Sequence, residues 1–275
     1  MTARLGLRFA ALGYLALLLV LPVGMVFWRT FQHGLGPVWS AATTPEALHA
    51  LWLTVIIALI AVPANTIFGV VCALVIVRGR FRGKALLNAL VDLPFALSPV
   101  VVGLALYLVY ARSGWFGGWL FDNGIRVIFA LPGMILATIF VSLPFVVREV
   151  VPVLRELGTD QEEAAWTLGA SPFAAFRRIT LPAIRWGITY GVVLTTARAI
   201  GEFGAVSVVS GNIAGRTETL TLHVQDRFQS FDLTGAYTAS VELAVLAVLT
   251  LLVMTLIRKE KSGGDSDSPG IEAVR

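Results

Sequence analysis

The sequence predicts an all-α membrane protein that crosses the bilayer six times. Of its 275 residues, 57% are hydrophobic and only 14% are charged, and the mean hydropathy is +0.81. In soluble domains about a quarter of all residues are charged, so this composition excludes an ordinary water-soluble enzyme and a disordered protein. One cysteine, Cys72, excludes a disulfide framework. The three histidines lie far apart in the chain and offer no metal-ligand spacing.

Six apolar runs are long enough to cross a bilayer, which takes about 20 residues in a helix. They cover residues 9–28, 47–77, 85–111, 127–147, 188–209 and 233–257. The first run is too long for a signal peptide, and Arg29 follows it in place of a small-residue cleavage site. We therefore interpret it as a retained first helix.

The distribution of Lys and Arg predicts the orientation of these spans. Fifteen lie in the N-terminal segment, in residues 78–84, in residues 148–185 and in the tail from Arg258. Five lie on the opposite side: Arg29, Arg112, Arg126, Arg216 and Arg227. Because cytoplasmic segments carry the excess of Lys and Arg, both termini and the long loop 148–185 are expected in the cytoplasm.

The loop 148–185 is too long for a simple connection, and it is expected to form two short helices. Thr159 and Glu162 have the spacing of a capping box at the start of the first. Gly169 can take the positive φ that ends it, and Ser171 and Pro172 have the form of N-cap and N1 of the second. Such helices either dock into a partner protein or lie on lipid headgroups, and composition alone leaves both possibilities open.

A motif in this loop resembles the EAA loop of importer-type ABC transporter permeases at every fixed position. The matching residues are Glu163, Ala164, Ala165, Gly169, Ile179, Leu181 and Pro182. The resemblance implies a type I importer permease bundle whose first loop helix sits in a cleft of a cytoplasmic ATPase. It also implies that Glu163 and its neighbours contact the ATPase, that Gly169 makes the turn, and that Ile179, Leu181 and Pro182 anchor the loop to the next span.

Further segments, around residues 92–101, 143–150, 158–165 and 197–213, are similar to the sulfate/thiosulfate branch of that family. The resemblance implies a multi-pass subunit of the bacterial inner membrane that forms the pathway of a sulfate/thiosulfate importer. The implied partners are a dimer of ATPase subunits, a second permease subunit or a second copy of this chain, a sulfate/thiosulfate-binding protein, sulfate and membrane lipid. No cofactor, metal or nucleic acid is implied.

The implied domain organisation has three parts. Residues 1–46 hold the first transmembrane helix and a periplasmic segment, residues 47–257 the permease domain with coupling loop 148–185, and residues 258–275 a flexible cytoplasmic tail. The sequence has no GxxxxGK[ST] phosphate loop, so ATP hydrolysis is expected in a partner subunit. The alternatives are a permease for molybdate, tungstate or another oxyanion, a secondary transporter or channel that works alone, and a membrane scaffold.

Four charged residues lie inside the predicted spans: Asp92, Arg198, Glu202 and Glu242. Such charges are costly in a bilayer and often mark a pathway. Arg198 and Glu202 are four residues apart, so they share a helix face and can form an ion pair. This pair is either part of the anion path or gate, or a contact that holds helices together. Gly201 and Gly204 beside it favour close helix packing.

Overall fold

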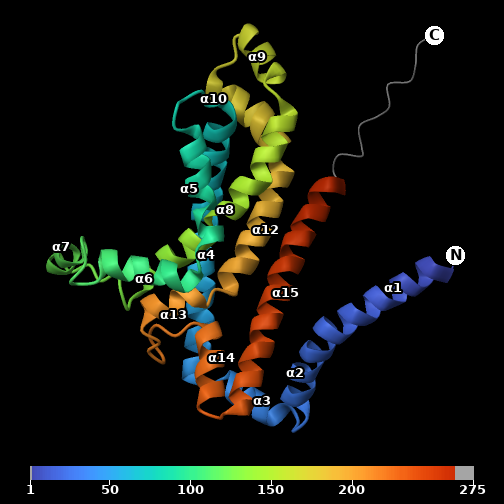
Figure 1. Ribbon diagram of the computed structural model, residues 1–275, viewed down its shortest axis with the longest axis vertical. Helices are drawn as coiled ribbons and strands as arrows, with labels where there is room; N and C mark the ends of the chain where they lie inside the picture. Colours follow the sequence, from blue (N-terminus) through green and yellow to red (C-terminus); the bar gives the residue numbers. More distant parts are fainter. Residues whose placement is uncertain (1, 264–275) are drawn as a thin grey trace.

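The computed structural model describes residues 2–263, and these residues form helices joined by short loops, with no strand among them (Figure 1). The helices are α1 Thr2–Leu15, η1 Ala16–Val20, α2 Leu21–Phe31, α3 Leu35–Ala42, α4 Pro45–Arg78, α5 Lys84–Ala96, α6 Pro99–Tyr110, α7 Gly117–Asp122, α8 Leu131–Leu157, α9 Asp160–Thr167, α10 Pro172–Ala175, η2 Phe176–Thr180, α11 Leu181–Ala183, α12 Arg185–Ile200, α13 Gly204–Ser210, α14 Leu220–Gln229 and α15 Leu233–Gly263.

Four helices in the described part of the chain are long and apolar enough to cross a membrane: Ala10–Phe31, Pro45–Arg78, Leu131–Leu157 and Leu233–Leu252. Two bent helix pairs are together long and apolar enough as well, α5 with α6 at 112° and α12 with α13 at 51°. The predicted number of six is reached when each bent pair counts as one span. The third and fifth of these spans are then each made of two helices that meet at a bend.

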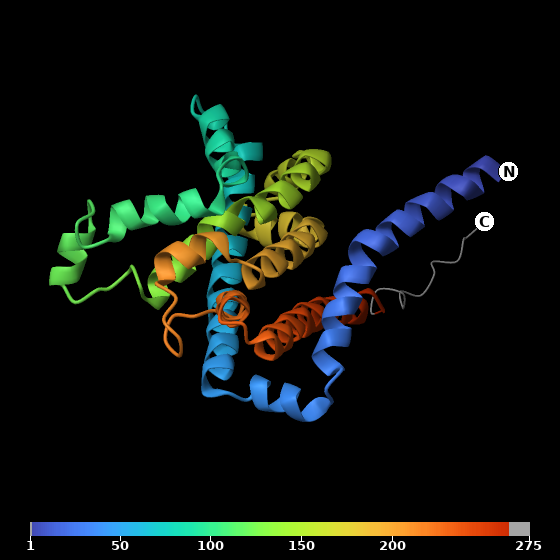
Figure 2. The same ribbon diagram turned by 60° about the horizontal axis from the view of Figure 1, so that its bottom comes forward.

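The third span breaks because Pro99 is the first residue of α6 and Ser98 before it is extended, with ψ 136°. A residue before proline is driven out of the helical region by the proline ring. Pro94, by contrast, lies inside α5 without ending it. After the break α6 projects sideways from the bundle toward α7 (Figures 1 and 2).

The centre of the bundle is α8, against which α4 and α12 pack. Gly69 of α4 and Gly191 of α12 both face Val146 of α8, and a Cβ at either glycine would lie only 2.7 Å from the nearest atom of Val146. The two outer helices therefore approach the α8 backbone very closely. Small residues at helix contacts are typical of packing in membranes. The buried residues around this contact form one continuous apolar cluster.

An ion pair joins α5 to α8 and gives Asp92, a charged residue inside a predicted span, a partner of opposite charge. The Arg148 Nε donates to Asp92 Oδ1 at 2.6 Å, and a second guanidinium nitrogen donates to Oδ2. Helix α8 continues past Arg148 and ends at Leu157. The first non-helical residue after α8 is Gly158, ten residues after the start of the predicted loop 148–185.

The two terminal helices differ in how much of them is covered. The segment 10–31 contributes no buried residues to its apolar window, and α1 diverges from the bundle (Figure 1). Helix α15 lies beside α12 and α14 and continues as helix to Gly263, six residues beyond the predicted end at Ile257. The remainder of the predicted flexible tail, residues 264–275, lies outside the described residues.

Candidate functional site

The tip made by α9 and α10 has the two-helix form that the sequence predicts. Gly169 has φ +86° and follows the C-cap of α9, so its positive φ ends the helix as expected. Ser171 is the N-cap of α10, its hydroxyl accepts a hydrogen bond from the Ala174 N–H at 3.2 Å, and Pro172 is the first helical residue. Both predictions are confirmed.

The predicted capping box at the start of α9 is wrong. Thr159 occupies the N-cap position, but its side chain makes no capping hydrogen bond. Glu162 turns toward the bundle, where its Oε1 accepts from Arg78 Nη2 at 3.1 Å and from Thr180 Oγ1 at 2.6 Å. A hydrogen bond between two charged groups is stronger than one to a backbone amide, which accounts for this choice. Glu162 is only 7% exposed.

Glu162 therefore ties three segments together. Arg78 is the last residue of α4, Thr180 is the last residue of η2, and Glu162 lies in the first turn of α9. The end of a long membrane helix is thus bonded to the short helix at the tip of the molecule.

The outer surface of the tip exposes large apolar side chains. Trp166, Leu168 and Phe173 are 48%, 89% and 71% exposed, and Glu163 and Ala164 beside them are exposed as well. A cluster of exposed apolar side chains rimmed by polar ones marks an interaction surface. The tip is the part of the chain farthest from α3 and α14 (Figure 1).

The residues expected to anchor the loop are less covered than their neighbours. Ile179 is half-buried, and Leu181 and Pro182 are exposed. The buried positions of this segment are instead Ala175, Thr180 and Ile184, the last with no exposed surface. The sequence signal for them is weak, because small and β-branched residues in a short loop have no distinctive spacing.

Arg198 and Glu202 form the ion pair that their spacing predicts, with Arg198 Nη1 and Glu202 Oε2 2.7 Å apart. The Glu202 side chain is 2% exposed and that of Arg198 is 29% exposed. The two residues do not share one helix, however. Arg198 is in the last turn of α12, whereas Glu202 lies in the break between α12 and α13.

Glu202 also stabilises the bend itself. Its Oε1 accepts from the Ala205 N–H at 2.8 Å, at the start of α13. Its backbone carbonyl, which would bond to residue 206 in a continuous helix, accepts from the Thr221 hydroxyl at 2.8 Å. Gly204 then packs against α6, since a Cβ there would lie 2.9 Å from Pro99. Gly201 has no such close contact with another helix.

A second buried acid–base pair was not predicted. His223 Nδ1 and Glu218 Oε1 are 3.1 Å apart, and their side chains are 3% and 1% exposed. Glu242 of α15, the remaining charge inside a predicted span, lies close enough to His223 to interact with it electrostatically. The described residues hold no cluster of three or more His, Cys, Asp or Glu that would bind a metal ion.

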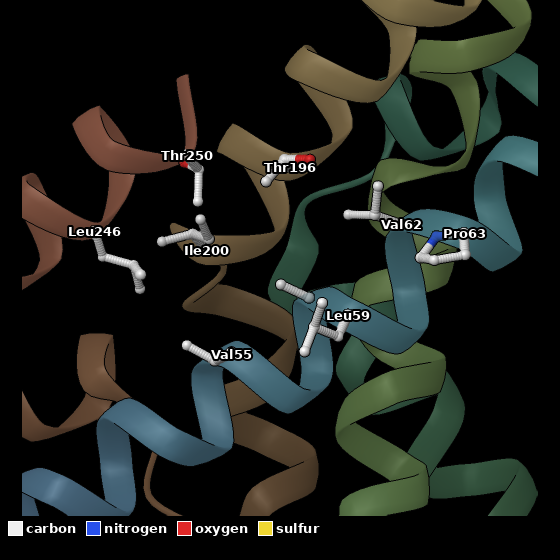
Figure 3. Close-up of a pocket in the computed structure, with 9 residues that line it drawn as sticks. Val55, Leu59, Val62, Pro63, Thr196, Ile200, Leu246 and Thr250 are labelled. Atoms are coloured by element: carbon white, nitrogen blue, oxygen red, sulfur yellow. The ribbon is translucent and has the colours of Figure 1, made fainter. Parts of the chain in front are cut away.

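The described chain also has an apolar cavity between α4, α12 and α15, of about 240 Å³ (Figure 3). Figure 3 shows Leu59, Ile200 and Leu246 directed toward the space between these helices. The lining includes two hydroxyl residues, Thr196 and Thr250, and no charged side chain. The cavity therefore offers no positive charge for holding an anion.

The fold is that of an ABC importer permease. It is similar to a chain of a bacterial ABC transporter involved in the import of the acidic polysaccharide alginate, with TM-score 0.79, 17% identity and coverage of 94% of this chain and 95% of that one. It is also similar to a chain of the MetNI methionine ABC transporter, with TM-score 0.57, 18% identity and coverage of 78% and 94%.

The chain belongs to the family described as the binding-protein-dependent transport system inner membrane component, which it matches over residues 65–260. It is 51% identical to the sulfate transport system permease protein CysW of Synechocystis sp., covering 90% of each chain. It is 49% identical to CysW of Escherichia coli, covering 88% of this chain and 84% of that one. The E. coli permease CysT is 40% identical over 88% of each.

The hydrogen bonds of Glu162 give a testable prediction, for which the neighbouring residue Glu163 provides a control variant. We expect Glu162→Gln to loosen α9, because hydrogen bonds involving a charged group contribute about 1.5–3 kcal/mol. Hydrogen exchange of the amides in residues 163–168 should then become about tenfold faster. Glu163→Gln is the matched control, since Glu163 is exposed and should leave exchange unchanged. Equal exchange in the two variants would contradict the role assigned to Glu162.

Proposed function

We propose that this chain is the permease subunit of an ATP-driven ABC importer for sulfate and thiosulfate. The observation that carries the proposal is the identity of about one half, across almost the whole chain, to relatives named as sulfate transport permeases. The chain's own apolar helices would place it in the bacterial inner membrane. Both termini and the α9–α10 tip would lie in the cytoplasm, as the excess of basic residues there predicts.

In this proposal the energy comes from a partner. Glu163, Ala164, Ala165 and the exposed apolar residues of the tip dock into an ATPase subunit, and the turn at Gly169 presents them. ATP binding brings two ATPase subunits together and displaces α9, and the Glu162 bonds carry that displacement to α4. The bundle then rocks between inward-facing and outward-facing states. Hydrolysis occurs in the partner, and this chain makes no covalent change to the anion.

The proposed assembly has a second permease across the pathway and a substrate-binding protein outside. The second permease is either a CysT-type subunit or a second copy of this chain. The likeness of this chain to both CysW and CysT proteins supports the CysT-type subunit. The sulfate/thiosulfate-binding protein would dock at the end that carries α3 and α14. Coupling loop 148–185 lies within the permease domain 47–257, and residues 1–46 and 258–275 flank that domain.

We assign to Arg198 and Glu202 a place at a gate of this pathway. The pair fixes the bend between α12 and α13, and the partly exposed guanidinium supplies positive potential beside it. In this role the Arg198 guanidinium would attract the passing anion, and Glu202 would hold the Arg198 side chain in position. The competing role is purely one of packing.

Arg198→Ala separates these two roles. We expect anion uptake to fall at least tenfold while the amount of assembled transporter in the membrane falls less than twofold. Arg198→Lys keeps the charge next to the buried Glu202 carboxylate and should retain part of the uptake. Labelled-sulfate uptake and co-purification of the subunits measure the two quantities. If Arg198→Ala abolishes assembly and Arg198→Lys restores assembly and full uptake, the pair serves packing alone.

The substrate is tested by uptake competition. Cells that depend on this chain should import [³⁵S]sulfate, and excess thiosulfate should inhibit that uptake much more strongly than excess molybdate. The comparison matters because molybdate permeases share a stretch resembling residues 197–205. Uptake that continues unchanged when this chain is deleted, in a strain without other sulfate permeases, would refute the sulfate assignment. Inhibition by molybdate at far lower concentration than thiosulfate would favour the molybdate alternative.

The coupling role predicts that Glu163→Lys and Gly169→Asp weaken the association of the ATPase with the membrane. The first reverses a charge on the docking surface, and the second places a side chain at a residue with φ +86°. Co-purification of the ATPase with the permease should fall severalfold in both. Asp122→Lys makes the same change of charge on exposed α7 and should leave association intact. Normal recruitment and uptake in both variants would exclude the coupling role.

A further inference from the structure

A large cavity lies beside α7, away from the α9–α10 tip and from the Arg198–Glu202 pair. It has a volume of about 680 Å³ and lies between the end of α6, α7, the loop before α8 and the loop after α13. Such a volume is within the range of sites for small molecules, about 300–1,000 Å³. Three arginines line it, Arg112, Arg126 and Arg216, and we call it the arginine pocket.

The arginine pocket has positive charge and no negative charge among its lining residues. Its other polar side chains are the hydroxyls of Tyr107, Tyr110 and Ser113, and the remainder of the lining is glycine or apolar. All three arginines are exposed, and the ion pairs found in the described residues do not include them. Asp122 is close in sequence to Arg126 but does not line the cavity.

Two of the guanidinium groups are held by the same aromatic ring. The guanidinium carbon of Arg112 lies 4.4 Å from the centre of the Phe121 ring, and that of Arg126 lies 5.8 Å from it. Cation–π stacking of this kind positions an arginine while its N–H groups stay available in the plane of the guanidinium. The third arginine is on a short turn, where its own N–H donates to the Ile213 carbonyl and its carbonyl lies 3.2 Å from His49 Nε2.

We propose that the arginine pocket binds a free tetrahedral oxyanion of the kind that the transporter carries. Guanidinium groups match the oxygens of such anions with paired, charge-assisted hydrogen bonds, and the three hydroxyl groups supply further donors. Apolar walls formed by residues such as Ile128 and Phe129 lower the local dielectric constant and strengthen these contacts. The inference rests on the proposed function and adds to it a binding site on this chain.

A free anion fits better than an acidic segment of another protein because the charges surround a hollow. Three cations from three separate loops line one cavity, whereas a docking patch for a protein would present them on a flat or protruding surface. All three also lie on the side of the membrane where the basic-residue count places delivery of the anion. The site would hold the anion at this subunit before it enters the pathway.

The test measures equilibrium binding of [³⁵S]sulfate to the assembled transporter, purified in detergent without the substrate-binding protein. We expect saturable binding to the wild type, weakened about tenfold by each of Arg112→Gln, Arg126→Gln and Arg216→Gln. Arg216→Lys should lose less affinity than Arg216→Gln, since it keeps the charge. Arg29→Gln is the matched control, because Arg29 is an exposed arginine of α2 outside the pocket.

Docking of the substrate-binding protein to the same variants, measured by surface plasmon resonance, completes the test. Loss of sulfate binding with normal docking supports the arginine pocket. Absence of sulfate binding to the wild type, or equal binding in all variants, overturns it. Loss of docking with unchanged sulfate binding also overturns it and assigns the arginines to a protein contact. If the wild type imports sulfate, each of these failures leaves the proposed function standing.

Discussion

The structure depends on one buried carboxylate, that of Glu162. Helix α9 has only eight residues, and a helix of that length has little stability by itself. Its outer face is exposed, so few apolar contacts hold it on the bundle. The bonds from Glu162 to Arg78 and Thr180 supply a fixed connection in their place. Without them the surface proposed to meet the ATPase would lose its side-chain bonds to α4 and to η2.

From Arg78 a series of close contacts leads into the bundle. Helix α4 has 34 residues and is therefore about 50 Å long. It meets α8 at Gly69, and α12 meets the same residue of α8, Val146, at Gly191. Interfaces packed this closely shift as units and deform little. Further along, α12 ends at the bend that Glu202 stabilises. The connected contacts therefore run from the tip to the candidate gate.

Much of this arrangement could be predicted from local sequence, because local chemistry determines it. Hydropathy gives the six spans, Gly169 and Ser171 give the loop helices, and a spacing of four residues gives the Arg198–Glu202 pair. The failures involve partners that are distant in sequence. Glu162 bonds to Arg78, 84 residues away, and no local pattern reveals that this contact replaces the capping box. The same holds for the arginine pocket, whose members come from separate loops. The orientation of the termini and the roles of the coupling residues stay predictions.

The central claim is that α9 and the end of α4 move as one body. Pulsed electron–electron double resonance between spin labels at Gln161 of α9 and Phe81 just after α4, both exposed, tests it in the assembled transporter with Cys72 replaced by alanine. The account predicts one sharp distance that stays the same with and without bound ATP, and a broad distribution once Glu162 is changed to glutamine. If the distance between the labels shifts by several ångströms on ATP binding in the protein that keeps Glu162, α9 moves independently of α4, contrary to the account.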